Sequence, residues 1–252
     1  MHILLTNDDG IHADGLFALY QELKKIAEVT VVAPDSERSS IGHAITLAHP
    51  IWIKKVKRHQ VLLGYGVTGT PADCVKIALA EILKKKPDLV ISGINLGPND
   101  GCSVIYSGTV AGAREGAICG LPSMAISLGT FKNPDFSYAA KIGSQLAKII
   151  HKNSIPPGTF LNVNVPNLKP SHIKGIRVTR QGMIPIHGHF ERREDPNDRT
   201  YYWMTGKLPG LEKDMSTDSY ALGKKYVVVT PIHCDMTDYS FLPTLKKWTF
   251  PL

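Results

Sequence analysis

The stretch HILLTNDDG, residues 2–10, joins a short apolar run directly to two adjacent carboxylates. The run HILLT is typical of a buried strand, and the Asn, Asp and Gly residues that follow it are those that turns favour. A surface turn would account for residues 7–10 taken alone. Residues 7–10 indicate a site rather than a turn only if other strands of the chain also end in polar residues.

Strands and helices alternate along the first 150 residues. Apolar residues recur at helical spacing after the first strand, and the segment TPAD (70–73) supplies a cap, a first-turn proline and an acidic residue that together favour a helix start. The predicted strands are 2–6, 29–34, 87–95 and 124–128, and the predicted helices are about 16–26, 70–83, a segment from about 109, and 142–150. This order predicts the α/β class, with a Rossmann-like, doubly wound, mostly parallel sheet.

The pattern changes after residue 160. The segments FLNVNVP (160–166), IRVTR (176–180) and YVVVTPI (226–232) are predicted as strands with no helix between them, which makes the sheet mixed towards the C-terminus. Residues 183–225 are polar and too many for an ordinary connection, so we expect an extended β-hairpin excursion that covers the active face or contacts another subunit. We therefore expect one α/β domain over residues 1–252, with its core at about 1–182 and 226–252.

The composition favours a globular cytoplasmic protein. A chain of 252 residues with 43% hydrophobic content can bury a sizeable core, and no apolar run reaches the length of a membrane span. The four cysteines form no Cys-x-x-Cys pair, and the chain starts with a strand rather than a leader. The formal charge of +7 favours anionic partners, but the basic clusters at 54–58 and 84–86 lack interleaved aromatics, so no stable nucleic-acid partner and no membrane are expected.

Polar side chains follow three of the predicted strands. The carboxyl ends of parallel strands meet at one edge of the sheet, so Asp8, Asp9, Ser39 or Ser40, and Asn95 are expected to converge there. Two carboxylates 4 Å apart repel by about 4 kcal/mol at an effective dielectric of 20, so the pair needs a cation or a shared proton. Oxygen donors alone favour Mg²⁺ or Mn²⁺. A general acid/base pair, as in glycosidases, is the less favoured alternative, because adjacent residues rarely flank a sugar bond.

The segment YSGTVAGA (106–113) predicts an anion site next to this edge. A helix that starts near Ser107, Gly108 and Thr109 presents free amides and the positive end of its dipole, although a plain helix cap would have the same sequence. The turn after the first strand lacks Gly-x-Gly-x-x-Gly, which disfavours dinucleotide oxidoreduction. His43 lies near this edge by loop position and either contacts substrate or braces its loop.

Five motifs in this order resemble the SurE family of stationary-phase survival proteins: NDDG (7–10), APD with SSIGHAITL (33–47), GTPADCV (69–75), SGINLGPNDG (92–101) and YSGTVAGAREG (106–116). The resemblance implies a metal-dependent 5′-nucleotidase, with 3′-nucleotidase activity as a further expectation, that hydrolyses nucleoside monophosphates or other small phosphomonoesters to phosphate. It also implies a Rossmann-like fold that dimerises or tetramerises through exchanged C-terminal elements. A sugar-nucleotide transferase and a non-catalytic nucleotide-binding module remain the alternatives.

The resemblance also assigns roles to individual residues. It implies one divalent ion per subunit, Mg²⁺ or Mn²⁺, held by Asp8, Asp9, Ser39 and Asn95, with Asp8 and Asp9 also catalytic. The substrate-binding residues that it implies are Asn99, Ser107, Gly108 and Thr109. We expect a polarised water to attack phosphorus in line, with Asp8 itself as the alternative nucleophile.

Overall fold

The structure is a computed structural model that describes residues 1–183, 188–205 and 212–251. Its strands are β1 (His2–Thr6), β2 (Glu28–Pro34), β3 (Ile53–Arg58), β4 (Val61–Val67), β5 (Leu89–Leu96), β6 (Ser123–Leu128), β7 (Thr159–Val165), β8 (Ile176–Val178), β9 (His189–Glu194), β10 (Thr200–Thr205) and β11 (Val227–His233). Its helices are α1 (Asp14–Leu23), α2 (Pro71–Ile77), the π-helix η1 (Ala78–Ile82), α3 (Ser103–Tyr106), α4 (Gly108–Ile118), α5 (Ser137–Lys152), the 3₁₀ turn η2 (Pro170–His172), α6 (Asp218–Gly223) and α7 (Leu242–Leu245).

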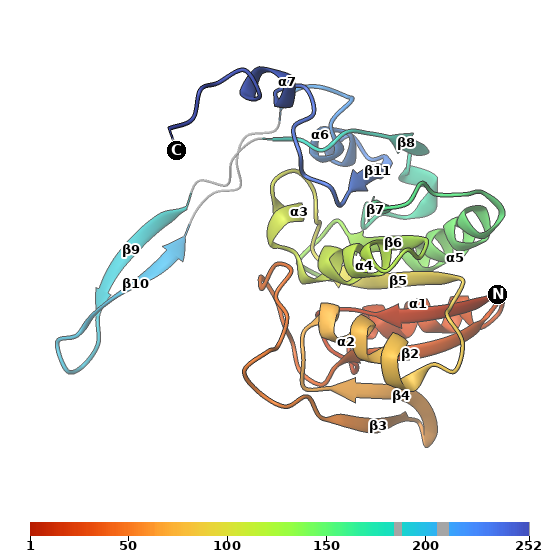
Figure 1. Ribbon diagram of the computed structural model, residues 1–252. Coiled ribbons are helices and arrows are strands. Elements are labelled where there is room, and N and C mark those ends of the chain that lie inside the picture. Colours follow the sequence, from red (N-terminus) through yellow and green to blue (C-terminus); the bar gives the residue numbers. More distant parts are fainter. Residues whose placement is uncertain (184–187, 206–211, 252) are drawn as a thin grey trace.

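Nine strands within the described residues form one sheet, in the order β3-β4-β2-β1-β5-β6-β7-β11-β8 (Figure 1). The six strands from β4 to β7 run parallel, whereas β3 and β11 are antiparallel to their neighbours β4 and β7. The predicted α/β class, with a mostly parallel sheet that becomes mixed towards the C-terminus, is confirmed.

Helices cover both faces of the parallel strands. On one face, α1 packs beside α5, and Ile3 and Leu5 of β1 join the large core cluster beneath them. On the other face, α2 packs beside α4, and Leu4 points into the cluster beneath α2. This alternation along a single strand is what a sheet buried on both faces requires. No helix in the described part of the chain is long and apolar enough to span a bilayer.

Three of the segments that differ from the sequence predictions bear on the fold. The predicted helix over 70–83 is α2 followed by a π-helical turn, which closes where the Leu83 amide donates to the Ala78 carbonyl (2.9 Å). The β3–β4 hairpin was not predicted, because the basic sequence IKKVKR of β3 hides its strand pattern at an exposed sheet edge. The prediction of no helix between the late strands was wrong, since α6 precedes β11 and packs against it.

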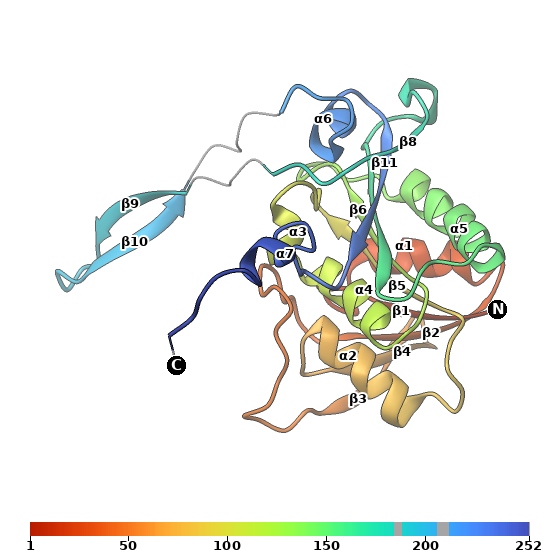
Figure 2. The same cartoon turned by 45° about the horizontal axis from the view of Figure 1, so that its top comes forward.

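The strands β9 and β10 pair with each other and with no other described strand. They form an arm that extends away from the body of the molecule (Figures 1 and 2). Of the excursion predicted over 183–225, residues 184–187 and 206–211 lie outside the described residues. Among the described ones, β9, β10 and the turn between them form the hairpin, whereas α6 and its preceding turn pack against the body.

Candidate active site

The predicted site residues lie at the point where the strand order reverses. Strands β2 and β4 lie on one side of β1, and β5 to β7 lie on the other, so β1 and β5 flank the switch point at which doubly wound sheets bind ligands. A cavity of about 540 Å³ opens there. Its lining residues are Asp8, Ser39, Ser40, Asn95, Leu96, Pro98, Asn99, Ser103, Tyr106, Ser107, Phe131 and Met204. A second cavity of about 490 Å³, beside His2 and Thr30 at the opposite ends of the strands, contains none of the predicted site residues.

Asp8 follows the end of β1 and is only 4% exposed. One carboxylate oxygen accepts a hydrogen bond from the Thr109 hydroxyl, which fixes the rotation of the carboxylate. Burial raises the pKa of Asp8 to about 7; the Thr109 bond opposes the shift, and the charge of Asp9 adds to it. Residue 108 must be glycine for this arrangement, because a Cβ there would lie 2.8 Å from Asp8 Cβ and 2.9 Å from Asp8 Oδ2.

Asp9 links the ends of the two central strands. Its Oδ2 accepts a hydrogen bond from the Leu96 amide (3.2 Å) at the end of β5. Burial raises the pKa of Asp9, the Leu96 bond lowers it, and the nearby Glu37 raises it further. Both carboxylates therefore stand in surroundings that disfavour their ionised forms unless a positive charge is added.

Ser39 and Asn95 direct their donor groups away from these carboxylates. The Ser39 hydroxyl donates to Glu37 Oε1 (2.6 Å), and Asn95 Nδ2 donates to the Gly97 carbonyl (2.8 Å). In both side chains the oxygen lone pairs are thus left for another ligand.

The residues present fit a hard divalent cation. All four predicted ligands are oxygen donors, and burial disfavours the ionised carboxylates that a cation would stabilise. Within residues 1–183, 188–205 and 212–251, no three His, Cys, Asp or Glu side chains are grouped so as to hold a metal ion, so a site here depends on the hydroxyl and amide oxygens as well.

The predicted phosphate segment begins α4 beside Asp8. Ser107 is the N-cap residue of α4, and its hydroxyl accepts a hydrogen bond from the Val110 amide (3.1 Å). Ser107 lines the cavity, whereas the side chain of Thr109 is fully buried and its hydroxyl is committed to Asp8. The backbone amides of Gly108 and Thr109 lack partners within the helix and can contribute to anion binding, and the Thr109 amide also lies against the Asp8 carboxylate, where it lowers the pKa.

Asn99 is held rigidly where it lines the cavity. Its backbone amide donates to Asn164 Oδ1 (2.8 Å), and its side-chain nitrogen donates to Ser127 Oγ (2.9 Å). Its carbonyl accepts from the side chains of Asn162 and Asn164. Ser127 of β6 and the residues Asn162 and Asn164 of β7 thus fix Asn99 in the loop that connects β5 to α3.

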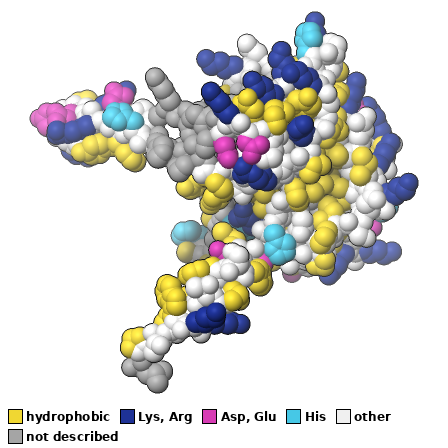
Figure 3. All heavy atoms as spheres, turned by 90° about the horizontal axis from the view of Figure 1, so that it is seen from above, with side chains coloured by type: hydrophobic (Ala, Val, Ile, Leu, Met, Phe, Trp, Pro, Cys, Tyr) yellow, Lys and Arg dark blue, Asp and Glu magenta, His cyan; other side chains and the backbone are white. Residues whose placement is uncertain are grey.

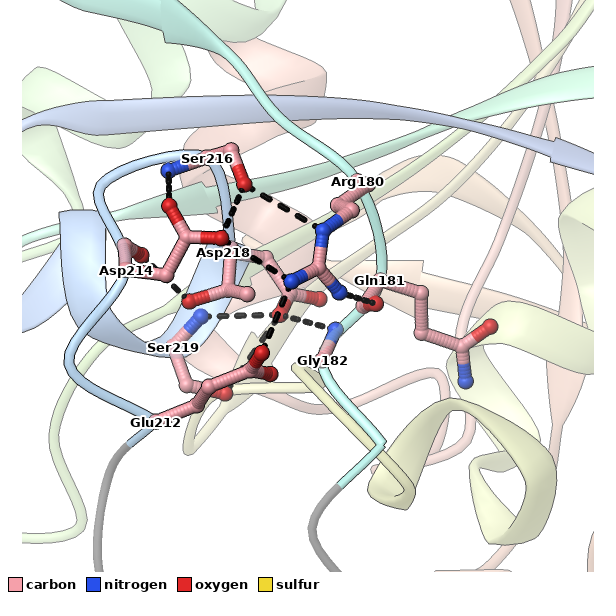
Figure 4. A network of polar contacts seen from close by, with 9 residues as sticks. Arg180, Gln181, Gly182, Glu212, Asp214, Ser216, Asp218 and Ser219 are labelled. Carbon is pink, nitrogen blue, oxygen red and sulfur yellow. Dashed lines mark hydrogen bonds and ion pairs between the residues drawn. The ribbon is translucent and has the colours of Figure 1, made fainter.

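Asp218, which was not among the predicted site residues, holds the other end of this loop. Its Oδ2 accepts from the Gly101 amide (2.9 Å), and its Oδ1 accepts from the amides of Gly182 and Ser219 (2.9 and 2.8 Å; Figure 4). The side chain is fully buried. Figure 4 also shows Arg180 beside it, in contact with Glu212 and Asp214. No local motif could reveal Asp218, because Gly101 is 117 residues away in the sequence.

Two buried carboxylates hold the loop that carries Ser39. Glu115 of α4 accepts from His43 Nε2 (2.7 Å) and from Lys76 Nζ (2.8 Å). Asp73 of α2 accepts from the Thr46 amide and hydroxyl (3.0 and 2.6 Å). Of the two roles considered for His43, the described contacts support bracing of the loop.

Comparison with known proteins identifies the family of this chain. The family model described as "Survival protein SurE" matches residues 3–187. The chain is 49% identical to the 5′-nucleotidase SurE of Syntrophobacter fumaroxidans, covering 98% of this chain and 99% of that protein, and 51% identical to that of Syntrophus aciditrophicus, covering 98% and 93%. Its fold matches the crystal structure of the SurE protein from Aquifex aeolicus with a TM-score of 0.86, at 42% identity and 98% coverage of both chains. By sequence over nearly its whole length and by fold, this chain is a member of the SurE family.

Proposed function

We propose that this protein is a metal-dependent phosphomonoesterase that removes phosphate from nucleoside 5′-monophosphates, and also from 3′-monophosphates. The observation that carries the proposal is the cavity at the switch point, where Asp8, Ser39, Asn95 and the start of α4 meet. An oxygen-donor set beside an anion-binding helix start suits a phosphate ester bound through a cation. The relatives named 5′-nucleotidase SurE support the nucleotide as substrate.

We assign the cation to Asp8, Asp9, Ser39 and Asn95, with one Mg²⁺ or Mn²⁺ per subunit. When bound there, it would neutralise charge and polarise a phosphate oxygen. The protein's own part is to keep the four oxygens in place. The Thr109 hydroxyl fixes Asp8, the Leu96 amide fixes Asp9, and the bracing contacts of His43 fix the loop that carries Ser39.

The start of α4 and Asn99 would bind the reacting phosphate. The first amides of α4, at Gly108 and Thr109, supply hydrogen-bond donors and the positive end of the helix dipole, which stabilise the charge on the equatorial oxygens of the transition state. Ser107 and Asn99 line the same cavity and would orient the ester. We propose water as the nucleophile. An acid quench that traps no phosphoenzyme is the expected result, whereas a phosphorylated Asp8 would assign the attack to that residue.

Further proposals concern the location, the assembly and the domain organisation of the protein. We propose a cytoplasmic homo-oligomer, a dimer or tetramer, of a chain that forms one α/β domain over residues 1–252. The substrate is a small phosphomonoester rather than nucleic acid or membrane. The exposed apolar side chains of the β9–β10 arm support a subunit contact there.

The test is phosphate release from 5′-AMP in the presence of Mn²⁺ or Mg²⁺. Asp8→Asn is expected to lose at least about 100-fold in kcat/KM, since even outer-shell changes at metal sites cost 10- to 100-fold. Asp14→Asn, which alters an exposed carboxylate paired with Arg58, is the matched control and should retain full activity. Retention of wild-type activity by Asp8→Asn would contradict the assignment.

The same assay separates the alternative functions. A sugar-nucleotide transferase would act on a nucleotide diphosphate-sugar and leave 5′-AMP intact. A non-catalytic module would bind 5′-AMP in calorimetry but release no phosphate with any divalent ion. Release from 5′-AMP that is abolished by a chelator and restored by Mn²⁺ is the result expected for a phosphomonoesterase.

A further inference from the structure

The cavity has an apolar rim that the phosphate chemistry does not use. The buried polar residues Asp8 and Ser107 line the floor of the cavity. The exposed side chains of Leu96, Tyr106 and Phe131 line its rim. Asp8 is the one charged side chain among the described lining residues. Phe131 is 63% exposed and Tyr106 is 57% exposed. Removing aromatic surface from water is favourable, so a ligand that covered both rings would gain binding free energy from them.

Phe131 is exposed but held in place. Gly97 lies directly beneath it, since a Cβ at position 97 would fall 2.1 Å from Phe131 Cε1. The turn that carries the ring is also fixed, because the Thr130 hydroxyl donates to the Lys132 carbonyl (2.8 Å) and accepts from the Lys132 amide (3.1 Å). One part of the ring thus rests on the backbone at the end of β5, and the rest of its surface stays open to the cavity.

Tyr106 places a second ring next to the phosphate position. It is the last residue of α3 and immediately precedes Ser107, the N-cap of α4. Its carbonyl accepts a hydrogen bond from the Gly42 amide (2.9 Å), which ties this position to the loop that carries Ser39. An aromatic ring is therefore attached one residue away from the proposed phosphate seat.

We propose that Phe131 and Tyr106 form a stacking subsite for the base of a nucleoside monophosphate, which makes Phe131 a specificity-determining residue. This inference rests on the proposed function and extends it from the phosphate to the rest of the substrate. A planar aromatic group joined to a phosphate by a sugar fits a cavity with a polar floor and an aromatic rim, and 540 Å³ lies within the range of small-molecule sites. Stacking uses the face of the base, so the subsite favours purines over pyrimidines and distinguishes adenine from guanine little.

The test compares a substrate that has a base with one that lacks it. Phe131→Ala should lower kcat/KM for 5′-AMP by about 5- to 150-fold, the range that loss of one stacking partner gives, and should leave kcat/KM for ribose 5-phosphate within about twofold of the wild-type value. Phe131→Tyr should restore the activity on 5′-AMP. Trp52→Ala, which removes an exposed aromatic ring outside the cavity, is the matched control and should change neither substrate. Equal losses on both substrates in Phe131→Ala would show that the ring only supports the fold, and would overturn the subsite.

Binding measurements keep the subsite apart from the proposed reaction. If the wild-type protein releases phosphate from neither compound, the proposed function fails, and calorimetry with 5′-AMP and ribose 5-phosphate then decides the subsite alone. Tighter binding of 5′-AMP by the wild-type protein, with the difference lost in Phe131→Ala, supports the subsite. Equal affinities for the two compounds, or no binding of 5′-AMP, overturn it.

Discussion

Glu115 illustrates how a single buried side chain outside the cavity supports the candidate site. Its side chain is 4% exposed and lies between His43 and Lys76. Burial alone would raise the pKa of Glu115, but the hydrogen bonds and charges of His43 and Lys76 outweigh it and hold the pKa at about 2. The ionised carboxylate is therefore more stable in the folded protein than in the unfolded chain.

This difference predicts how stability depends on pH. The contribution of Glu115 is fully present above its ordinary pKa of 4.5 and is lost as the pH falls through about 2. We expect Glu115→Gln to lower the free energy of unfolding by on the order of 2 kcal/mol at pH 7, and the gap to the wild-type protein to narrow below pH 4.5. Urea unfolding at pH 7, 4 and 3 measures the gap.

Glu22→Gln serves as the control for this prediction. Glu22 pairs with Lys25 one helical turn away on the exposed surface, and such pairs contribute about 0–1 kcal/mol. Its substitution should have little effect at any of the three pH values. A gap for Glu115→Gln that stays constant from pH 7 to pH 3 would mean that packing, rather than charge, accounts for its effect.

The residues that could be predicted from the sequence are those next to strand ends. Asp8, Asp9 and Asn95 follow apolar runs, so parallel-sheet topology alone brings them to one edge. Strand-end position alone does not decide whether Ser39 or Ser40 is the ligand, and only the resemblance to the SurE family selects Ser39. Glu115 and Asp218 could not be predicted, since each acts through partners from distant segments and neither lies at the end of a strand.

At the level of structural elements, the loop between β5 and α3 is clamped at both ends. The sheet residues Asn162 and Asn164 hold Asn99, and Asp218 of α6 holds Gly101. The same Asp218 carboxylate accepts from the Gly182 amide, in the segment that leads towards the arm. The position of a loop lining the cavity is thus coupled to the short helix before β11.

Asp218→Asn tests this clamp. The carboxylate uses both oxygens as acceptors, and an amide would place an N–H group against a backbone N–H, which leaves buried groups without partners at a cost of about 1–3 kcal/mol. We expect a lower melting temperature and faster amide exchange over residues 97–101. Hydrogen–deuterium exchange measured by mass spectrometry would detect the latter change.

Asp214→Asn is the matched control within the same network. Asp214 pairs with Arg180 at the surface, so its loss should leave exchange over residues 97–101 unchanged. If the two variants behaved alike, the loop would not depend on the buried carboxylate.

The elements that could not be predicted share a physical cause. The strand β3 is basic and exposed, and α6 has only six residues with two buried side chains, so neither shows the periodicity of a longer, half-buried element. The central strands and the helices α1, α4 and α5 could be predicted, because their apolar patterns match the buried surfaces of a doubly wound sheet.

For the molecule as a whole, the β9–β10 arm presents exposed apolar side chains on two strands that pair with no other described strand. Phe190, Tyr202 and Met204 are exposed, and the strand register places them on one face of the arm. Figure 3 shows hydrophobic side chains along the arm and again along the projecting C-terminal segment, with acidic groups at the arm's tip. A two-stranded hairpin is marginally stable alone, so the proposed subunit contact would also stabilise the arm.

The oligomer is expected to depend on this face. The double substitution Phe190→Glu and Tyr202→Glu places two charges on it, which should convert the proposed dimer or tetramer to smaller species. Size-exclusion chromatography with light scattering measures the mass. Arg199→Ala near the tip is the control and should leave the mass unchanged; an unchanged mass in the double variant would exclude this face as the contact.

The hydrogen bond between Thr109 and Asp8 joins residues 101 positions apart in the chain, whereas the arm pairs residues that are close in sequence. Contacts between distant residues form slowly, because a long loop must close before they give any stabilisation. During refolding from denaturant, the strands of the arm can meet early, although the hairpin stays marginally stable until the proposed subunit contact forms. The carboxylates of the site reach their final positions only when β1, β5 and α4 have assembled. The rate at which phosphate release returns would therefore follow the slowest step of sheet assembly.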